Sequence, residues 1–172
     1  KGVESVEKVD LSVEEMEARV REIRAQLGTK LFIPGHHYQK DEVIQFADST
    51  GDSLQLAQVA ASNKEAEHIV FCGVHFMAET NKILCPDKKV LLPDLNAGCS
   101  LADTCKAEDL AQYKKEHPEY KVVAYVNTSA AVKALTDIVV TSSNARQVVE
   151  SFPKDEKILF APDKNLGGYL NA

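Results

Sequence analysis

The sequence predicts an α/β fold made of repeated three-layer α/β/α domains, each with a small parallel sheet between helices. Apolar runs of strand length alternate with helical segments, which is typical of parallel sheets covered on both faces. A Pro-Asp-x-Asn-x-Gly sequence follows an apolar run twice, at 93–98 and 162–167, and indicates an internal repeat. Polar clusters also follow the apolar runs, at the strand ends where such sheets bind ligands.

The first half of the chain opens with a helix whose start and stop residues are readable. Ser12 and Glu15 have the spacing of a capping box, apolar residues recur at helical spacing, and Gly28 ends the pattern, so a helix is expected over 12–27. After it, strand and helix patterns alternate. Strands are expected at 30–33, 69–72 and 90–92. Helices are expected after Asp41 or Asp48, at 53–62 and 76–84, from about 100, and at 107–116.

The second half predicts another domain of the same kind. We place the boundary near Pro118, which gives domains at 1–118 and 119–172. Setting Ile69 against Ile138 superimposes the two Pro-Asp-x-Asn-x-Gly sequences and predicts the register of the repeat. Strands are expected at 121–126, 138–140 and 157–160, and helices at 130–135 and 144–152.

Composition limits the classes of function. The 172 residues are 44% hydrophobic, which suits a chain that buries a core, and the net charge of −6 includes no basic stripe, so nucleic acid is not an expected partner. No apolar run reaches the roughly 20 residues that cross a bilayer, and the start lacks a signal-peptide pattern. We therefore expect a cytoplasmic protein with no membrane partner, whose four cysteines are free thiols or metal ligands.

Cys99 is the cysteine most suited to chemistry. It follows Gly98 and opens a predicted helix, whose N-terminus favours a thiolate, so it reads as a nucleophile or a metal ligand. A helix-capping residue without chemistry would have the same sequence context. Cys72 and Cys85 lie in apolar surroundings that predict burial. Cys105 is six residues past Cys99, a poor spacing for two metal ligands on one helix face, so a structural role is expected for it.

Candidate acid, base and binding groups follow other strands. His36 and Tyr38 come just after the first strand and share a face of an extended chain, so His36 is preferred over His37 for acid/base work. Two solvated loop histidines are the alternative. Further polar groups stand at predicted helix starts or at a strand end, where they suit a carboxylate or phosphate but also a purely structural role, and these are Ser53, Ser142, Tyr125 and Asn127.

Several of these motifs, in this order, resemble the quinolinate synthase family. The resemblance runs from about Leu31 to the end of the sequence. It is carried by His-His-Tyr-Gln at 36–39, Ala-Asp and Gly-Asp-Ser-Leu at 47–54, Phe-Cys-Gly-Val-His-Phe-Met-Ala-Glu at 71–79, Ala-Gly-Cys-Ser at 97–100, Tyr-Val-Asn-Thr at 125–128 and the second Pro-Asp-x-Asn-x-Gly.

The resemblance implies a reaction and a cofactor. Family members condense iminoaspartate with dihydroxyacetone phosphate to quinolinate, with loss of phosphate and water, at a [4Fe-4S] cluster held by three cysteines. Cys99 matches the first cluster cysteine. His36, Tyr38 and Tyr125 match residues that act on the substrate, and the substrate-binding set would consist of His36, Tyr38, Ser53, Tyr125, Asn127 and Ser142. An L-aspartate oxidase or dehydrogenase would supply iminoaspartate.

The resemblance also implies that part of the enzyme is missing from this sequence. Family members continue into a third domain, which carries the other two cluster cysteines, so we expect this chain alone to be a truncated, inactive form. Two other functions fit the residues. One is a small-molecule or phosphate-binding α/β module in which Cys99 has no role, and the other is a cysteine-nucleophile enzyme that uses Cys99 with His36.

Overall fold

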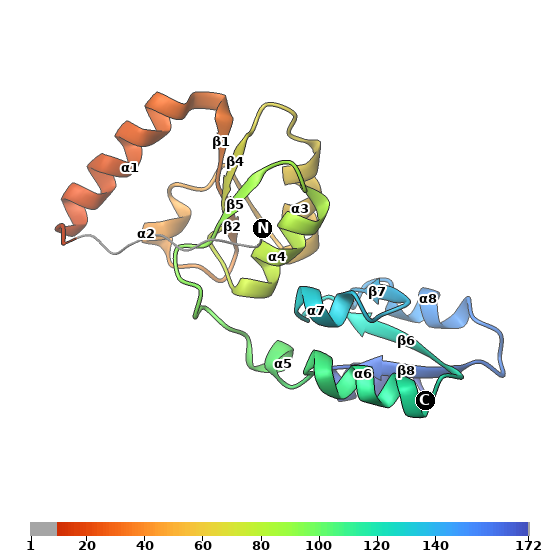
Figure 1. Cartoon of the computed structure of the whole chain (residues 1–172). Coiled ribbons are helices and arrows are strands. Elements are labelled where there is room, and N and C mark those ends of the chain that lie inside the picture. The colour runs from red at the N-terminus through yellow and green to blue at the C-terminus, as the bar shows by residue number, and fades with distance from the viewer. Residues whose placement is uncertain (1–9, 172) are drawn as a thin grey trace. The chain divides into compact units, whose positions relative to one another are not determined.

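Helices and short strands alternate through residues 10–171, which are the part of the chain that the computed structural model describes (Figure 1). Every strand pair among these residues is parallel. The predicted α/β class, with small parallel sheets, is thereby confirmed. The contacts divide the chain into two compact units, which meet between Ala97 and Gly98 and are described separately below.

The first unit holds two small sheets. One has the strand order β1-β4-β5, and the other pairs β2 with β3. The strands are β1 (Leu31–Phe32), β2 (Pro34–His36), β3 (Ser49–Gly51), β4 (His68–Val70) and β5 (Lys89–Leu91). The helices are α1 (Val13–Leu27), α2 (Asp41–Ile44), α3 (Ser53–Ser62) and α4 (His75–Leu84), with a 3-10 turn, η1 (Gly28–Lys30), after α1. Figure 1 shows α1 on one side of the strands and α3 with α4 on the other.

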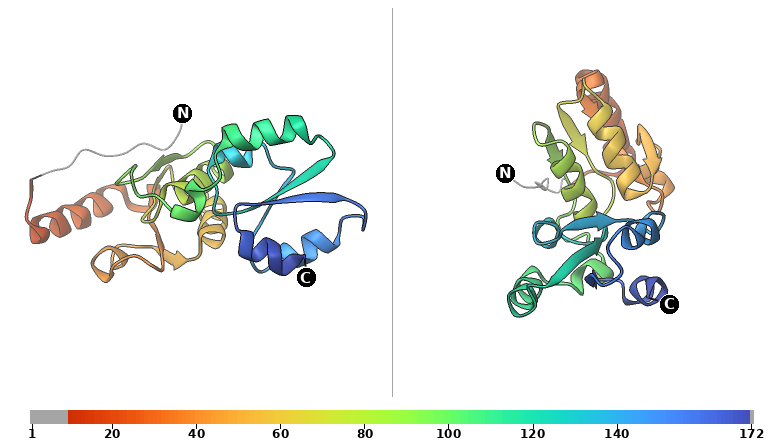
Figure 2. Two further views of the ribbon diagram at one scale, coloured as in Figure 1. Left: turned by 90° about the horizontal axis from the view of Figure 1, so that it is seen from below. Right: turned by 90° about the vertical axis from the view of Figure 1, so that its right-hand side faces the viewer.

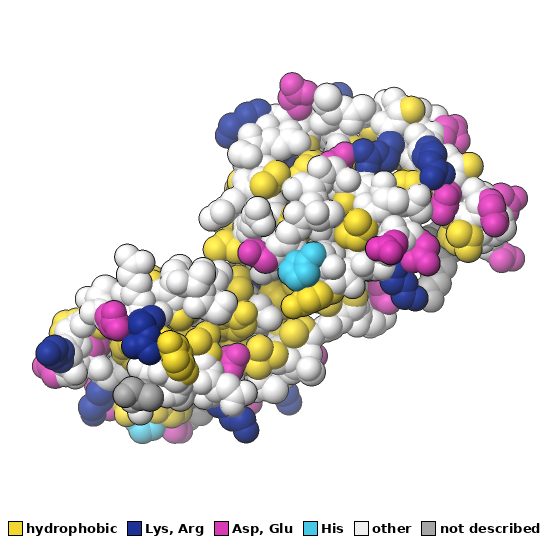
Figure 3. Space-filling view, turned by 180° about the vertical axis from the view of Figure 1, so that it is seen from behind, with side chains coloured by type: hydrophobic (Ala, Val, Ile, Leu, Met, Phe, Trp, Pro, Cys, Tyr) yellow, Lys and Arg dark blue, Asp and Glu magenta, His cyan; other side chains and the backbone are white. Residues whose placement is uncertain are grey.

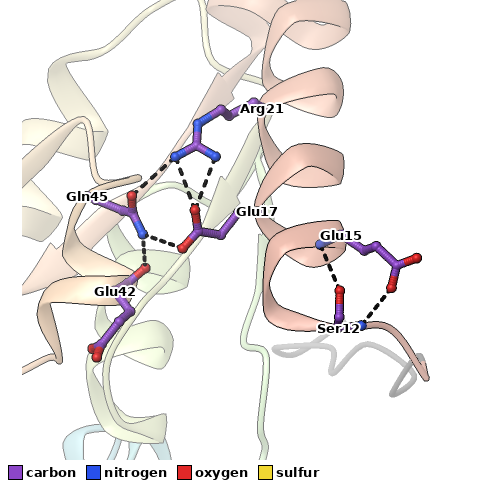
Figure 4. Close-up of polar contacts among 6 residues, drawn as sticks. All are labelled: Ser12, Glu15, Glu17, Arg21, Glu42 and Gln45. Carbon is purple, nitrogen blue, oxygen red and sulfur yellow. Dashed lines mark hydrogen bonds and ion pairs between the residues drawn. The ribbon is translucent and has the colours of Figure 1, made fainter.

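The predicted capping box fixes the start of α1. The Glu15 N–H donates to Ser12 Oγ at 3.2 Å, and the Ser12 N–H donates to Glu15 Oε2 at 2.8 Å (Figure 4). Further along α1, Glu17 and Arg21 both hydrogen-bond the side chain of Gln45, just after α2 (Figure 4). These contacts fix the helix against the α2 corner of the unit.

The core of the first unit lies between its strands and the α3–α4 pair. Leu56 of α3, Ile69 of β4 and Phe71 just beyond β4 are all 0% exposed. On the other side, α2 approaches β2 so closely that a Cβ at Gly35 would lie 2.8 Å from Ile44 Cδ1. A larger residue at this position would require the Ile44 side chain to shift and would crowd Ala47 Cβ, which would lie 3.0 Å from the added Cβ.

The second unit has a single three-stranded sheet in the order β7-β6-β8. Its strands are β6 (Tyr120–Tyr125), β7 (Ile138–Val140) and β8 (Lys157–Ala161). Its helices are α5 (Ser100–Asp103), α6 (Ala107–Glu116), α7 (Ala130–Lys133), α8 (Ala145–Glu150) and α9 (Lys164–Leu170). Both views of Figure 2 show α8 and α9 side by side.

Helices cover both faces of this sheet. Adjacent residues of a strand point to opposite faces, and Val122 of β6 packs with Leu110 of α6 and Val132 of α7. The next residue, Val123, packs on the other face with Ala145 of α8, against which α9 residues also lie. The predicted three-layer arrangement is present in this unit.

The boundary between the units falls earlier than the predicted one near Pro118. Leu110 of α6 belongs to the core of the second unit, so the segment from Gly98 to Pro118 belongs with the second unit and not with the first. Pro118 marks only the loop between α6 and β6.

The repeat has a different register from the one predicted. In the first unit the Asp48 carboxylate accepts from the Ile33 N–H, and in the second the Asp137 carboxylate accepts from the Val122 N–H, both at 2.8 Å. Equivalent residues therefore differ by 89 positions (33 to 122, 48 to 137). This offset also places β3 on β7, α2 on α7 and the start of α4 on the start of α9.

The predicted register, with Ile69 set against Ile138, is wrong because it equates strands at different places in their sheets. β4 has β1 on one side and β5 on the other, whereas β7 is an edge strand. At the 89-residue offset β4 matches β8, and both lie beside the strand that opens their unit. The two Pro-Asp-x-Asn-x-Gly sequences are alike only locally: in each, the Asp side chain accepts from the N–H two residues later at 2.9 Å.

The surface carries mixed charge. On the face drawn in Figure 3, Lys and Arg side chains are interspersed with Asp and Glu. Within residues 10–171 no helix combines the length and the apolar character that crossing a membrane requires.

Candidate functional site

His36 ends strand β2 and is buried, at 5% exposure. Its backbone N–H donates to the Cys72 carbonyl at 2.9 Å, while β3 pairs with the other edge of β2. The sequence predicted a loop at His36 because Pro34 and Gly35 usually break a strand. These residues are extended instead, because Cys72 on one edge and β3 on the other both hydrogen-bond to them.

The rings of His36, His37 and Tyr38 form a cluster at this strand end. Ring centroids lie 4.3 Å apart for His36 and His37, 4.6 Å for His36 and Tyr38, and 4.3 Å for His37 and Tyr38. Tyr38 is 83% exposed, and His37 is exposed as well. The two adjacent histidines therefore differ in exposure although their rings are in contact, and of the three rings only that of His36 is shielded from solvent.

The surroundings of His36 favour a neutral imidazole. Burial lowers the pKa of His36, the neighbouring His37 lowers it further, and Asp52 opposes this shift. The Tyr38 N–H donates to His36 Nδ1 at 3.3 Å, so the neutral ring carries its proton on Nε2. His36 can thus donate a hydrogen bond from Nε2 to a substrate oxygen without first being protonated.

Ser53 is the first residue of α3 and is 6% exposed. The N-cap is Asp52, whose carboxylate accepts from the Gln55 N–H at 2.8 Å. The predicted helix start is therefore confirmed, with the cap one residue earlier than Ser53. Ser53 follows Gly51, the residue paired with His36 in the β2–β3 sheet, by two positions.

Tyr125 and Asn127 occupy the end of β6 and the turn after it. Tyr125 is the last residue of the strand, and its carbonyl accepts from Thr128 Oγ1 at 3.1 Å. The Lys133 ammonium donates to the carbonyls of Val126, at 2.8 Å, and of Thr128. The turn that carries Asn127 is thus wrapped around a positive charge from α7.

Ser142 does not stand at a helix start. It is exposed, in the turn between β7 and α8, and α8 begins at Ala145 after the N-cap residue Asn144. The prediction of a helix start at Ser142 is wrong because Asn144 folds back, with Oδ1 accepting from the Thr141 N–H at 2.8 Å. This bond closes a turn before the helix.

Six predicted site residues occupy three equivalent positions of the repeat. At the 89-residue offset, three positions correspond between the units: the strand-end residue, the residue two positions later, and the serine two positions after the neighbouring strand (β3 or β7). The pairs are His36 with Tyr125, Tyr38 with Asn127, and Ser53 with Ser142. The two units therefore carry different side chains at the same three positions of the repeat.

The four cysteines are free thiols in different surroundings. Cys99 is half-buried and directly precedes α5, as predicted, although this helix spans only four residues. Cys85 is buried, and Cys72 is half-buried with its pKa raised by burial to about 11. Burial also raises the pKa of Cys105.

The described residues do not by themselves fit a [4Fe-4S] cluster. Such a cluster takes several thiolates around one cube, and within residues 10–171 no three His, Cys, Asp or Glu side chains gather closely enough to hold a metal ion. Cys99 is available as one ligand only.

The family is decided by comparison with known proteins. A family model described as quinolinate synthetase A protein matches residues 18–172. The chain belongs to the quinolinate synthetase A protein family. Curated relatives named quinolinate synthase include those of Anoxybacillus flavithermus, 57% identical, Geobacillus sp. WCH70, 56% identical, and Bacillus cereus AH187, 54% identical. Each match covers 91% of this chain and 46% of the relative, so the chain spans about half the length of these quinolinate synthases.

Sequence reasoning missed three residues that shape the candidate site of this family member. Asp48 and Asp137 bind the strands that carry the site residues, and Lys133 holds the turn of Asn127. The sequence signal that could have identified the two aspartates is their spacing of 89 residues, which is the offset of the repeat. This offset was not recognised, because the two Pro-Asp-x-Asn-x-Gly sequences suggested another register of the repeat.

Proposed function

We propose that this chain supplies two substrate-binding units of a quinolinate synthase, which condenses iminoaspartate with dihydroxyacetone phosphate with loss of phosphate and water. Family membership supports the assignment. One observation supports the choice of the residues that act. Six candidate side chains fall at three equivalent positions of two repeated units, all at or just beyond strand ends. That is where α/β sheets bind small ligands.

The side chains suit a substrate rich in carbonyl, hydroxyl and carboxylate oxygens. His36 offers a neutral N–H donor, and Tyr38 and Tyr125 offer phenols that can donate or accept a proton. Ser53, Asn127 and Ser142 offer neutral hydrogen bonds to carboxylate or phosphate oxygens. We assign acid/base work to His36, Tyr38 and Tyr125, and substrate binding to all six residues.

We further propose that Cys99 is a ligand of a [4Fe-4S] cluster, with the remaining ligands outside the described residues. When bound, an iron of the cluster would act as a Lewis acid toward substrate oxygen. Iminoaspartate is a reactive imine, so an L-aspartate oxidase or dehydrogenase is the proposed partner that forms it. We place the reaction in the cytoplasm as part of NAD biosynthesis.

The test is complementation of a bacterial strain that lacks quinolinate synthase and needs added nicotinate. Because the chain matches 46% of the Anoxybacillus flavithermus relative, a chimera can join it to the unmatched part of that protein. The chimera should restore growth without nicotinate, and the chain alone should not. Chimeras with Cys99→Ser or His36→Ala should fail, whereas Cys105→Ser should succeed.

Two results would reject the proposal. If the Cys99→Ser chimera grows as well as the parent, Cys99 has no part in the activity. If no chimera grows although each is folded, and the chain binds inorganic phosphate without any metal, the small-molecule-binding alternative is favoured.

A further inference from the structure

The same backbone clamp closes both units. In the first, the Asp48 N–H donates to the Ile33 carbonyl at 2.8 Å, and Asp48 Oδ2 accepts from the Ile33 N–H at 2.8 Å. In the second, the Asp137 N–H donates to the Val122 carbonyl at 2.9 Å, and Asp137 Oδ2 accepts from the Val122 N–H at 2.8 Å. One aspartate thus binds both backbone groups of one strand residue.

The clamp lies directly before the candidate site in each unit. Ile33 is three residues before His36, and Asp48 is five residues before Ser53. The second unit repeats these intervals, from Val122 to Tyr125 and from Asp137 to Ser142. The aspartate therefore joins the two strands whose far ends carry the site residues.

We propose that Asp48 and Asp137 are positioning residues, which set the register of neighbouring parallel strands so that the site residues of each unit come together. The value of this positioning for activity rests on the proposed function, whereas the effect on strand register does not. A slip of one residue would turn every side chain of the strand to the opposite face, and would move His36 away from the end of β3.

The β2–β3 pair needs this device because it is short. Only three residues of each strand are paired, from Pro34 opposite Ser49 to His36 opposite Gly51. The Pro34 carbonyl and the His36 N–H both bond to Cys72 on the opposite edge of β2, so these two residues give no backbone bonds to β3. The β2–β3 pair therefore has few bonds of its own with which to resist slippage. The Asp48–Ile33 bonds add two fixed points at its beginning.

A cation from the outer helix supports each clamp. Arg24 of α1 donates to the Phe46 carbonyl, and it also pairs with Asp48 Oδ1. Lys114 of α6 donates to the Leu135 carbonyl at 2.5 Å, and Leu135 is the repeat equivalent of Phe46. The two units thus hold the same corner with different basic residues, which is expected if the position of the corner matters more than the residue that fixes it.

The experiment compares amide hydrogen exchange, followed by NMR, in the chain and in two Asp48 variants. Asp48→Ala removes the carboxylate, whereas Asp48→Asn keeps an oxygen that can accept from the Ile33 N–H. The reporter is the His37 N–H, which donates to the Gly51 carbonyl at 3.3 Å across the β2–β3 pair. The internal reference is the His36 N–H, which donates to Cys72 on the opposite edge of β2.

We expect Asp48→Ala to speed exchange at His37 by about ten-fold or more while His36 changes less, and Asp48→Asn to stay within about three-fold of the parent. NOE contacts between His36 and Gly51 should weaken in Asp48→Ala only. Arg19→Ala, which breaks an exposed ion pair on α1, is the matched control and should change neither reporter.

The second unit gives an independent test if Asp48→Ala does not fold. Asp137→Ala should speed exchange of the Val126 N–H, which donates to the Val140 carbonyl at 2.8 Å, and leave His37 unchanged. Uniform acceleration of all amides in a unit would show a role in stability alone and would overturn the proposal, as would unchanged reporters. These readouts need no substrate, so they remain decisive even if the complementation test of the proposed function fails.

Discussion

At the scale of single residues, the buried His36 makes stability depend on pH. Its pKa is lowered from 6.5, mainly by burial, so the unfolded chain binds this proton at a higher pH than the folded chain does. Between the folded and unfolded pKa values, the unfolded state therefore holds more protons. The free energy of unfolding should rise with pH up to about 6.5 and lose this dependence above it.

Urea unfolding between pH 5 and pH 8, followed by circular dichroism, measures this effect. His36→Gln should flatten the rise, because it removes the titrating group. His37→Gln should shrink the rise without abolishing it, since the charge of His37 is the second cause of the lowered pKa. An equal slope in the parent and in His36→Gln would contradict the assignment.

Cys72 should be the slow thiol of the native chain. Burial raises its pKa from 9.0 to about 11, so near pH 8 it carries about 100-fold less thiolate than an ordinary cysteine. Iodoacetamide labelling, read by mass spectrometry, should modify Cys72 about 100-fold faster in urea than in the native chain. Equal rates in the two conditions would show that the Cys72 site is open to solvent.

At the scale of elements, equivalent strands of the two units differ in their neighbours. β4 lies between β1 and β5, and Phe71 just after it is 0% exposed, whereas β8 is an edge strand and Phe160 is half-buried. Phe71→Ala should therefore destabilise the first unit by about 3–5 kcal/mol. Phe160→Ala should cost the second unit about half as much or less, because less apolar area leaves water on folding.

Unit-specific amide exchange is the suitable measurement, because it reports on each of the two compact units by itself. Ile69→Val and Ile158→Val form the matched control pair, since Ile69 is 0% exposed and Ile158 is half-buried. The same ranking is expected there with smaller values, about 1 kcal/mol in β4. Equal losses for Phe71→Ala and Phe160→Ala would contradict the edge assignment of β8.

Elements were predictable from the sequence where local chemistry decides their bounds. The helix over 53–62 and the strand over 138–140 have the predicted limits. The signals that set these limits, which are capping residues, apolar periodicity and turn residues, lie in or next to the segments themselves. β2 was not predictable, since its extended form depends on hydrogen bonds from Cys72 and β3. α9 was missed because Gly167 and Gly168 disfavour a helix locally, although Asp163 caps it by accepting from the N–H groups of Asn165 and Leu166.

At the scale of the whole molecule, the repeat explains why candidate residues were found while their arrangement was not. Strand-end side chains such as His36 and Tyr125 are visible in the sequence, because polar residues after apolar runs stand out. Their equivalence depends on an offset supported by few identical residues. Asp48 and Asp137 carry it, and their role becomes clear only through the bonds to Ile33 and Val122.

The number of ligands in the chain limits how much iron it can bind. Cys99 is a proposed cluster ligand, yet no three ligand side chains gather within residues 10–171, and the chain spans 46% of its relatives. Anaerobic reconstitution with iron and sulfide should therefore leave the isolated chain without a stable 4Fe absorbance band and with far fewer than about four iron atoms per chain. The chimera with the Anoxybacillus flavithermus relative should hold the cluster, and its Cys99→Ser variant should lose it. A stable band with iron near four on the isolated chain would show that residues of this chain alone complete the site.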